Sequence, residues 1–90
     1  MFSLEKSERF QKEYTDFSRR AEKVENMRVR GELDTLLKQL LAQVRIIDME
    51  HKNVMSKTGI ADTVSDSRTK LASIRKKITK YLEDYENSLN

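Results

Sequence analysis

The feature that most constrains this chain is an apolar stripe that runs from Leu33 to Val54. Large aliphatic residues recur there at alternating spacings of three and four, and His51 stands at the one gap in the series: Leu33, Leu37, Leu40, Val44, Ile47 and Val54. A period near 3.6 residues places these side chains on one face of a helix. Leu36 and Leu41 widen the apolar arc to about 140°, at roughly 100° per residue, which exceeds a two-stranded seam. The stripe therefore predicts a helix that packs against two neighbours.

Composition limits the chain to one small all-α domain, residues 1–90. The sequence contains no proline and two glycines, and 37% of its residues are charged, most of them good helix formers. The absence of cysteine excludes disulfides and thiolate metal sites. Because so short a chain builds a modest core, association with another helical chain is expected.

Neither terminus nor interior carries a membrane signal. The first ten residues are charged where a signal peptide has an apolar core, and no run approaches the roughly 20 apolar residues of a membrane span. The formal net charge is +3, which is too mild to demand a polyanionic partner. These patterns predict a cytoplasmic or otherwise intracellular protein without a membrane span.

A first helix is expected at about 3–26, with Ser3 as its N-cap. Its stripe is largely aromatic and consists of Phe10, Tyr14, Phe17, Ala21 and Val24. The following segment, 26–31, holds the two weak helix breakers Asn26 and Gly31. If the helix ran straight through it, the first stripe would point roughly 135° away from the central one. The chain either turns here, which we favour, or continues as one long helix.

A second break is expected at 56–62, where Gly59 can end one helix and Asp62 or Thr63 can cap the next. This defines an antiparallel hairpin of helices at about 30–56 and 63–89. Leu40 and Ile78 lie equally far from Gly59 along the chain, so we expect them to face each other. In the same way, Tyr14 and Val44 are equidistant from Val29, which supports a turn there.

The predicted fold is therefore an all-α, up-down-up three-helix bundle. The alternative is a long continuous N-terminal helix in a coiled-coil dimer, in which the aromatic stripe projects outward and binds a partner. The residues assigned to this apolar partner-binding role are Phe10, Tyr14, Phe17 and Val24.

No residue pattern predicts catalysis, a cofactor, a metal site or a small-molecule substrate. His51 is the one histidine, and we expect it to pack at the edge of the core. It has no second histidine nearby to share a metal, and no serine or threonine stands in a nucleophile-elbow or phosphate-loop context.

A basic face on the last helix is the strongest surface signal. Four lysines lie opposite its apolar stripe and are candidates for phosphate contact: Lys70, Lys76, Lys77 and Lys80. The best interpretation is a small non-enzymatic protein-interaction module, an adaptor, assembly factor or regulator that acts through helix packing. It would bind a protein partner or form a homodimer. The alternative is an accessory nucleic-acid-binding protein that uses the lysine face.

Overall fold

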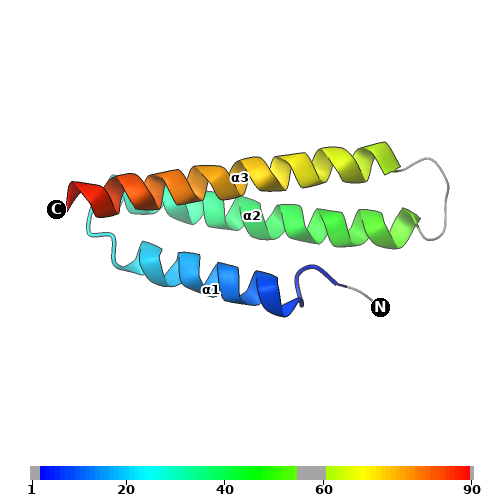
Figure 1. Cartoon of the computed structure of the whole chain (residues 1–90), viewed down its shortest axis with the longest axis horizontal. Coiled ribbons are helices and arrows are strands. Elements are labelled where there is room, and N and C mark those ends of the chain that lie inside the picture. Colours follow the sequence, from blue (N-terminus) through cyan, green and yellow to red (C-terminus); the bar gives the residue numbers. More distant parts are fainter. Residues whose placement is uncertain (1–2, 55–60, 90) are drawn as a thin grey trace.

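The computed structural model describes residues 3–54 and 61–89. It shows three helices, each antiparallel to the one before it in the chain (Figure 1). Helix α1 spans Glu8–Glu22, α2 spans Met27–Val54 and α3 spans Ala61–Ser88. The molecule is elongated, with principal extents of 51 × 22 × 17 Å. The predicted up-down-up bundle is confirmed. The continuous N-terminal helix is not formed, because the chain leaves the helix at residues 23–26.

Helix α1 begins later than the sequence predicts, because Ser7 rather than Ser3 is its N-cap. The Ser7 hydroxyl accepts a hydrogen bond from the Phe10 amide at 3.2 Å and donates one to the Leu4 carbonyl at 2.8 Å. These bonds satisfy a helix-end amide and fix the preceding turn. Residues 4–6 therefore form a turn that leads into α1.

The turn between α1 and α2 is closed by Asn26 and not by Gly31. The Asn26 side-chain oxygen accepts hydrogen bonds from the Arg28 and Val29 amides at 3.0 and 3.2 Å, so α2 begins at Met27 and not at the predicted residue 30. Gly31 lies inside this helix, where a glycine costs about 1 kcal/mol relative to alanine. Burial of the leucines that follow it outweighs that cost.

The earlier turn also shifts the register between the first two helices. Tyr14 lines a surface hollow with Leu37 and Lys38 of α2. These residues lie about two helical turns before Val44, the predicted neighbour of Tyr14. The predicted register was wrong because it centred the turn on Val29, which lies inside α2.

The core lies along the common axis of the three helices. Leu40 and Ile78 are both fully buried in it, as expected for a facing pair, whereas Gly59 lies outside the described residues. One apolar cluster joins all three helices: Phe10, Phe17, Ala21, Val24, Leu33, Leu36, Leu37, Leu40, Val44, Ile47, Leu71, Ile78 and Leu82.

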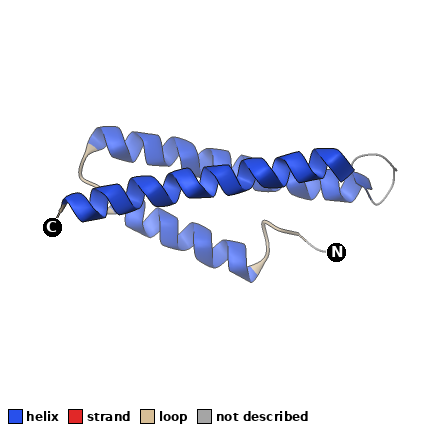
Figure 2. Cartoon of the chain, turned by 45° about the horizontal axis from the view of Figure 1, so that its top comes forward, coloured by secondary structure: helices blue, strands red, loops and turns tan. Residues whose placement is uncertain are grey.

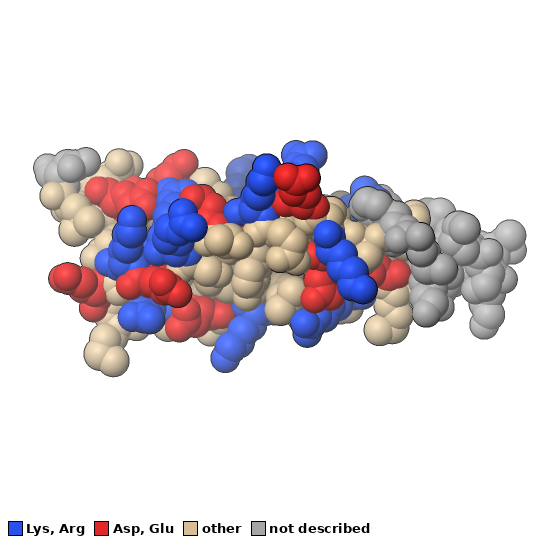
Figure 3. Space-filling view, turned by 90° about the horizontal axis from the view of Figure 1, so that it is seen from below, with Lys and Arg blue, Asp and Glu red and all other residues tan. Residues whose placement is uncertain are grey.

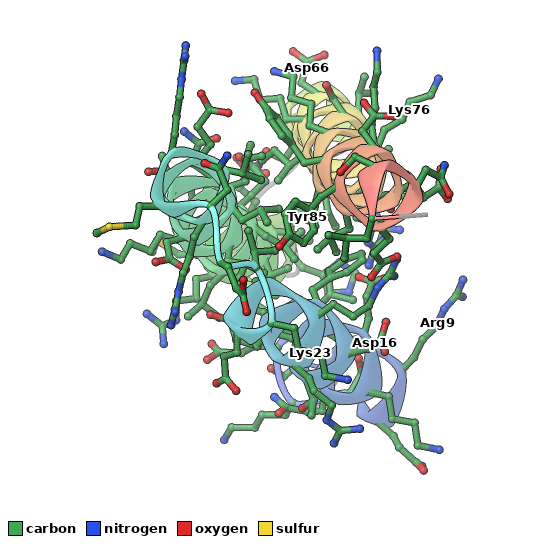
Figure 4. All side chains as sticks on the ribbon, turned by 90° about the vertical axis from the view of Figure 1, so that its left-hand side faces the viewer. Arg9, Asp16, Lys23, Asp66, Lys76 and Tyr85 are labelled. Carbon is green, nitrogen blue, oxygen red and sulfur yellow. The ribbon has the colours of Figure 1, made fainter. Side chains whose placement is uncertain are left out.

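Two ion pairs connect α1 to α3 at different positions along the bundle. The Arg20 guanidinium donates two hydrogen bonds to the Glu86 carboxylate, at 2.6 and 2.9 Å, and Arg75 donates one to Glu13 at 2.7 Å. The hydrogen bonds with Arg20 lower the pKa of Glu86, and those with Glu86 raise the pKa of Arg20. The Tyr85 hydroxyl lies between the helices (Figure 4) and accepts from the Glu25 amide at 3.1 Å.

Candidate functional site on the outer face of α2 and α3

The aromatic stripe of α1 lies inside the bundle. Phe10, Phe17 and Val24 are buried, with Phe10 only 1% exposed, and Tyr14 is partly buried with its ring 5.7 Å from that of Phe10. The stripe thus closes the core of the folded-back chain. A partner reaches the three buried residues only if α1 leaves the bundle.

Helix α1 covers one side of the α2–α3 hairpin, and the opposite side is open (Figures 2 and 4). On that open side, the described side chains of α2 between Met27 and His51 include five exposed, uncharged residues at helical spacing. We call this set the outer strip, and it consists of Thr35, Gln39, Ala42, Ile46 and Met49. Ile46 is 42% exposed and Met49 is 63% exposed. In a chain with 37% charged residues, an uncharged strip of four turns is a distinctive surface.

A shallow groove of about 370 Å³ runs between the outer strip and α3. We call it the outer groove. The apolar part of its lining, which we call the apolar floor, consists of exposed Ala42 and Ile46 of α2 and half-buried Ile74 of α3. Polar side chains complete the lining: Gln39 and Gln43 from α2, and Lys70, Ser73 and Lys77 from α3. Apolar floor and polar rim together are typical of a surface that binds another protein.

The four lysines predicted to contact phosphate do not converge on one site. Lys70 and Lys77 line the outer groove, whereas Lys76 and Lys80 are exposed and do not line it. Figure 4 shows Lys76 pointing outward from α3. At 100° per residue, Lys76 and Lys80 fall directly opposite the buried side of α3, and the other pair falls beside the groove.

The charged residues in the middle of α3 are all positive. Between Ser67 and Leu82 the sequence holds six basic residues and no acidic one. Arg75 is paired with Glu13 of α1, so its charge is compensated on the far side of the helix. The rim of the outer groove therefore carries net positive charge.

At one end of this region, Tyr81 of α3 interacts with Glu32 of α2. The Glu32 carboxylate raises the pKa of Tyr81, first as a hydrogen-bond acceptor and then through its negative charge. At the other end, Asp66 is exposed one turn before Lys70 (Figure 4). The positive section of the rim thus lies between two acidic positions.

The opposite face differs in the lining of its hollows. A hollow of about 360 Å³ on α1 has only polar and charged residues around it: Glu8, Gln11, Lys12, Thr15, Asp16 and Arg19. Seen from the α1 side, Lys and Arg alternate with Asp and Glu, and neither sign dominates (Figure 3). His51 is exposed and does not pack in the core, so that expectation was wrong. Within residues 3–54 and 61–89, no group of His, Asp or Glu side chains is arranged to hold a metal ion.

The sequence reasoning missed the outer strip because it followed the apolar stripe and treated the rest as solvated surface. The signal was an absence of charge at 35, 39, 42, 46 and 49, which share the face opposite the core stripe.

No helix in the described part of the chain combines the length and apolarity that a membrane crossing requires. Comparison with family models, with curated proteins and with solved structures finds no match to this chain.

Proposed function

We propose that this protein is a non-enzymatic protein-interaction module, an adaptor, assembly factor or regulator, that binds a helix of its partner along the outer groove. The observation that carries the proposal is the uncharged outer strip beside a groove with an apolar floor, on the side that α1 leaves open.

The groove suits a helix because its own walls are helices. An amphipathic helix laid along it would set residues spaced by three and four against Ile46 and Ile74. The small side chain of Ala42 lets the two backbones approach closely. Full burial of an isoleucine or methionine contributes about 1.5–3 kcal/mol. Covering the exposed parts of Ile46, 42%, and Met49, 63%, therefore contributes about 1.5–3 kcal/mol together, a minor part of the roughly 8 kcal/mol of a micromolar affinity.

A second copy of this chain is a poor occupant. Packing the outer groove against itself about a two-fold axis would bring Lys70 and Lys77 of both copies together. Among the residues that the structure describes, no carboxylate lines the groove to compensate them. We therefore propose a different protein as the partner.

One observation supports nucleic-acid binding as a second candidate, namely the six basic residues between Ser67 and Leu82 of α3, a stretch without an acidic residue. Two of the four candidate lysines do not line the groove, and its described lining holds no aromatic residue for base stacking. The two candidates differ in salt dependence, because phosphate contacts weaken steeply with salt and buried apolar contacts do not.

Site-specific photo-crosslinking in cells that express the full chain tests the proposal. A photoreactive amino acid at Gln43 in the groove should capture one protein, and the same group at exposed Thr15 of α1 should not. Nuclease treatment before purification should leave the adduct intact. Identical adducts from both positions would contradict the proposal, and nucleic-acid adducts from Gln43 would favour the second candidate.

A further inference from the structure

We infer that the helix that occupies the outer groove is acidic on one flank, with carboxylates seven residues apart beside its apolar stripe. This inference rests on the proposed function and adds the chemistry of the partner.

The first support is that no described carboxylate lies within ion-pair distance of the rim lysines. Arg20, Arg45 and Arg75 each form an ion pair with a glutamate, at 2.6 to 3.2 Å. Neither Lys70 nor Lys77 forms one with any residue in the described ranges. Two uncompensated ammonium groups beside an apolar floor favour a ligand that brings negative charge.

The second support is their spacing. Lys70 and Lys77 are seven residues apart on α3, which is two helical turns, or about 10.5 Å along the axis. A partner helix that lies along the groove presents its own residues with the same repeat. Two Glu or Asp side chains at i and i+7 would therefore meet the two lysines together.

The third support is the asymmetry of the two rims. The α3 side of the lining carries both lysines, whereas the α2 side offers uncharged residues, among them Gln39 and half-buried Gln43. Acidic residues on the partner are thus expected on the flank over α3, and uncharged polar residues on the flank over α2. This asymmetry determines the rotation of the partner helix about its own axis.

An apolar floor distinguishes this ligand from a nucleic acid. Ile46, Ile74 and Ala42 offer no donor or acceptor to a sugar–phosphate backbone, and phosphate binding leaves them exposed. An acidic amphipathic helix uses both the floor and the rim.

A displayed library of amphipathic helices tests the inference on the full chain. The apolar positions are fixed as Leu and Ala, and both flanks are varied among Glu, Lys, Gln and Ser. Selection against the wild-type protein should enrich Glu on one flank at i and i+7. A pool that is neutral or basic on both flanks overturns the inference and leaves the proposed function standing.

Charge-reversal variants of the protein test whether peptide binding depends on the two rim lysines. Lys70→Glu with Lys77→Glu should weaken binding of the acidic peptides at least about tenfold, since two ion pairs are lost and charge reversal adds repulsion. The control Arg9→Glu with Lys38→Glu makes the same change in net charge elsewhere on the surface and should have little effect. Equal weakening by both pairs contradicts a specific contact.

Ile46→Asp and, as a second floor variant, Ala42→Arg should abolish binding while circular dichroism reports unchanged helix content. Peptides that bind these variants as well as the wild type overturn both the inference and the docking surface. A labelled oligonucleotide serves as a further probe. If it binds, loses binding with the lysine reversal and keeps it with Ile46→Asp, the groove rim recognises phosphate and the inference is wrong.

Discussion

Asp48 provides the sharpest test of how α1 is held. Its carboxylate accepts three hydrogen bonds from the N-terminal turn: the Leu4 amide at 2.6 Å, the Glu5 amide at 3.0 Å and the Ser3 hydroxyl at 3.1 Å. Oδ1 serves the first and Oδ2 serves the other two. Asp48→Asn keeps one oxygen but replaces the other with an NH₂ group, which cannot accept from the Glu5 amide.

The expected loss of stability is about 2 kcal/mol. Hydrogen bonds to a charged group contribute about 1.5–3 kcal/mol each, and the lower end applies here because these bonds are only part-buried and water can replace them. In a domain of this size, about 2 kcal/mol lowers the melting temperature by roughly 8–16 °C. The amides of Leu4 and Glu5 should also exchange hydrogen faster.

Urea denaturation and amide hydrogen exchange measure both effects. Asp34→Asn is the matched control, since Asp34 is an exposed carboxylate on the same helix, and it should change stability by less than about 0.5 kcal/mol. If Asp48→Asn unfolds like the control and protects Leu4 and Glu5 as the wild type does, the N-terminal turn is not held by this carboxylate.

Leu40→Ala should cost about 2–5 kcal/mol in urea denaturation, because Leu40 and Ile78 are fully buried in one cluster; a loss below about 0.5 kcal/mol would show that the site is not core. Gly31→Ala should stabilise the protein by about 0.5–1 kcal/mol, since Gly31 is exposed inside α2 and a β-carbon there meets nothing within 4 Å; destabilisation would place a chain break at this residue. The pKa of Glu86 is lowered from 4.5 in the folded state by its hydrogen bonds with Arg20, so its contribution is present above that pKa and is lost as the pH falls through the lower folded value. An NMR titration should show this low midpoint, and Arg20→Gln should return it to the ordinary range.

The apolar stripes were sufficient to predict the three helices and the core. Leu33, Leu40 and Val44 have the spacing of one helix face, and that face is buried in the structure. Burial of apolar area is the largest favourable contribution to folding. The residues that share an apolar helix face in the sequence are therefore the ones buried in the structure.

The ends of the helices were not predictable in the same way. Asn26 and Gly31 were both weak breakers, and the choice between them depended on a side-chain oxygen that accepts two amides. The Asp48 bonds join residues more than 40 positions apart, and no local period encodes such a contact. Long-range polar contacts depend on the register between helices, and the predicted register of α1 against α2 was wrong.

The candidate site was predicted only in part. The lysines of α3 were recognised as a group, but helical phase separates Lys70 and Lys77 from Lys76 and Lys80. The groove itself requires two helices in a known register, so no single stretch of sequence contains it.

The most direct test of the proposed function is the affinity of the crosslinked partner for two variants of α2. Ile46→Asp places a charge on the groove floor, whereas Met27→Asp places the same charge at Met27, which is 87% exposed at the start of the helix. Titration calorimetry should show that Ile46→Asp weakens binding at least about tenfold, because a carboxylate covered by an apolar partner loses its hydration, and that Met27→Asp does not. Equal affinities for both variants and the wild type would contradict a partner helix in the outer groove.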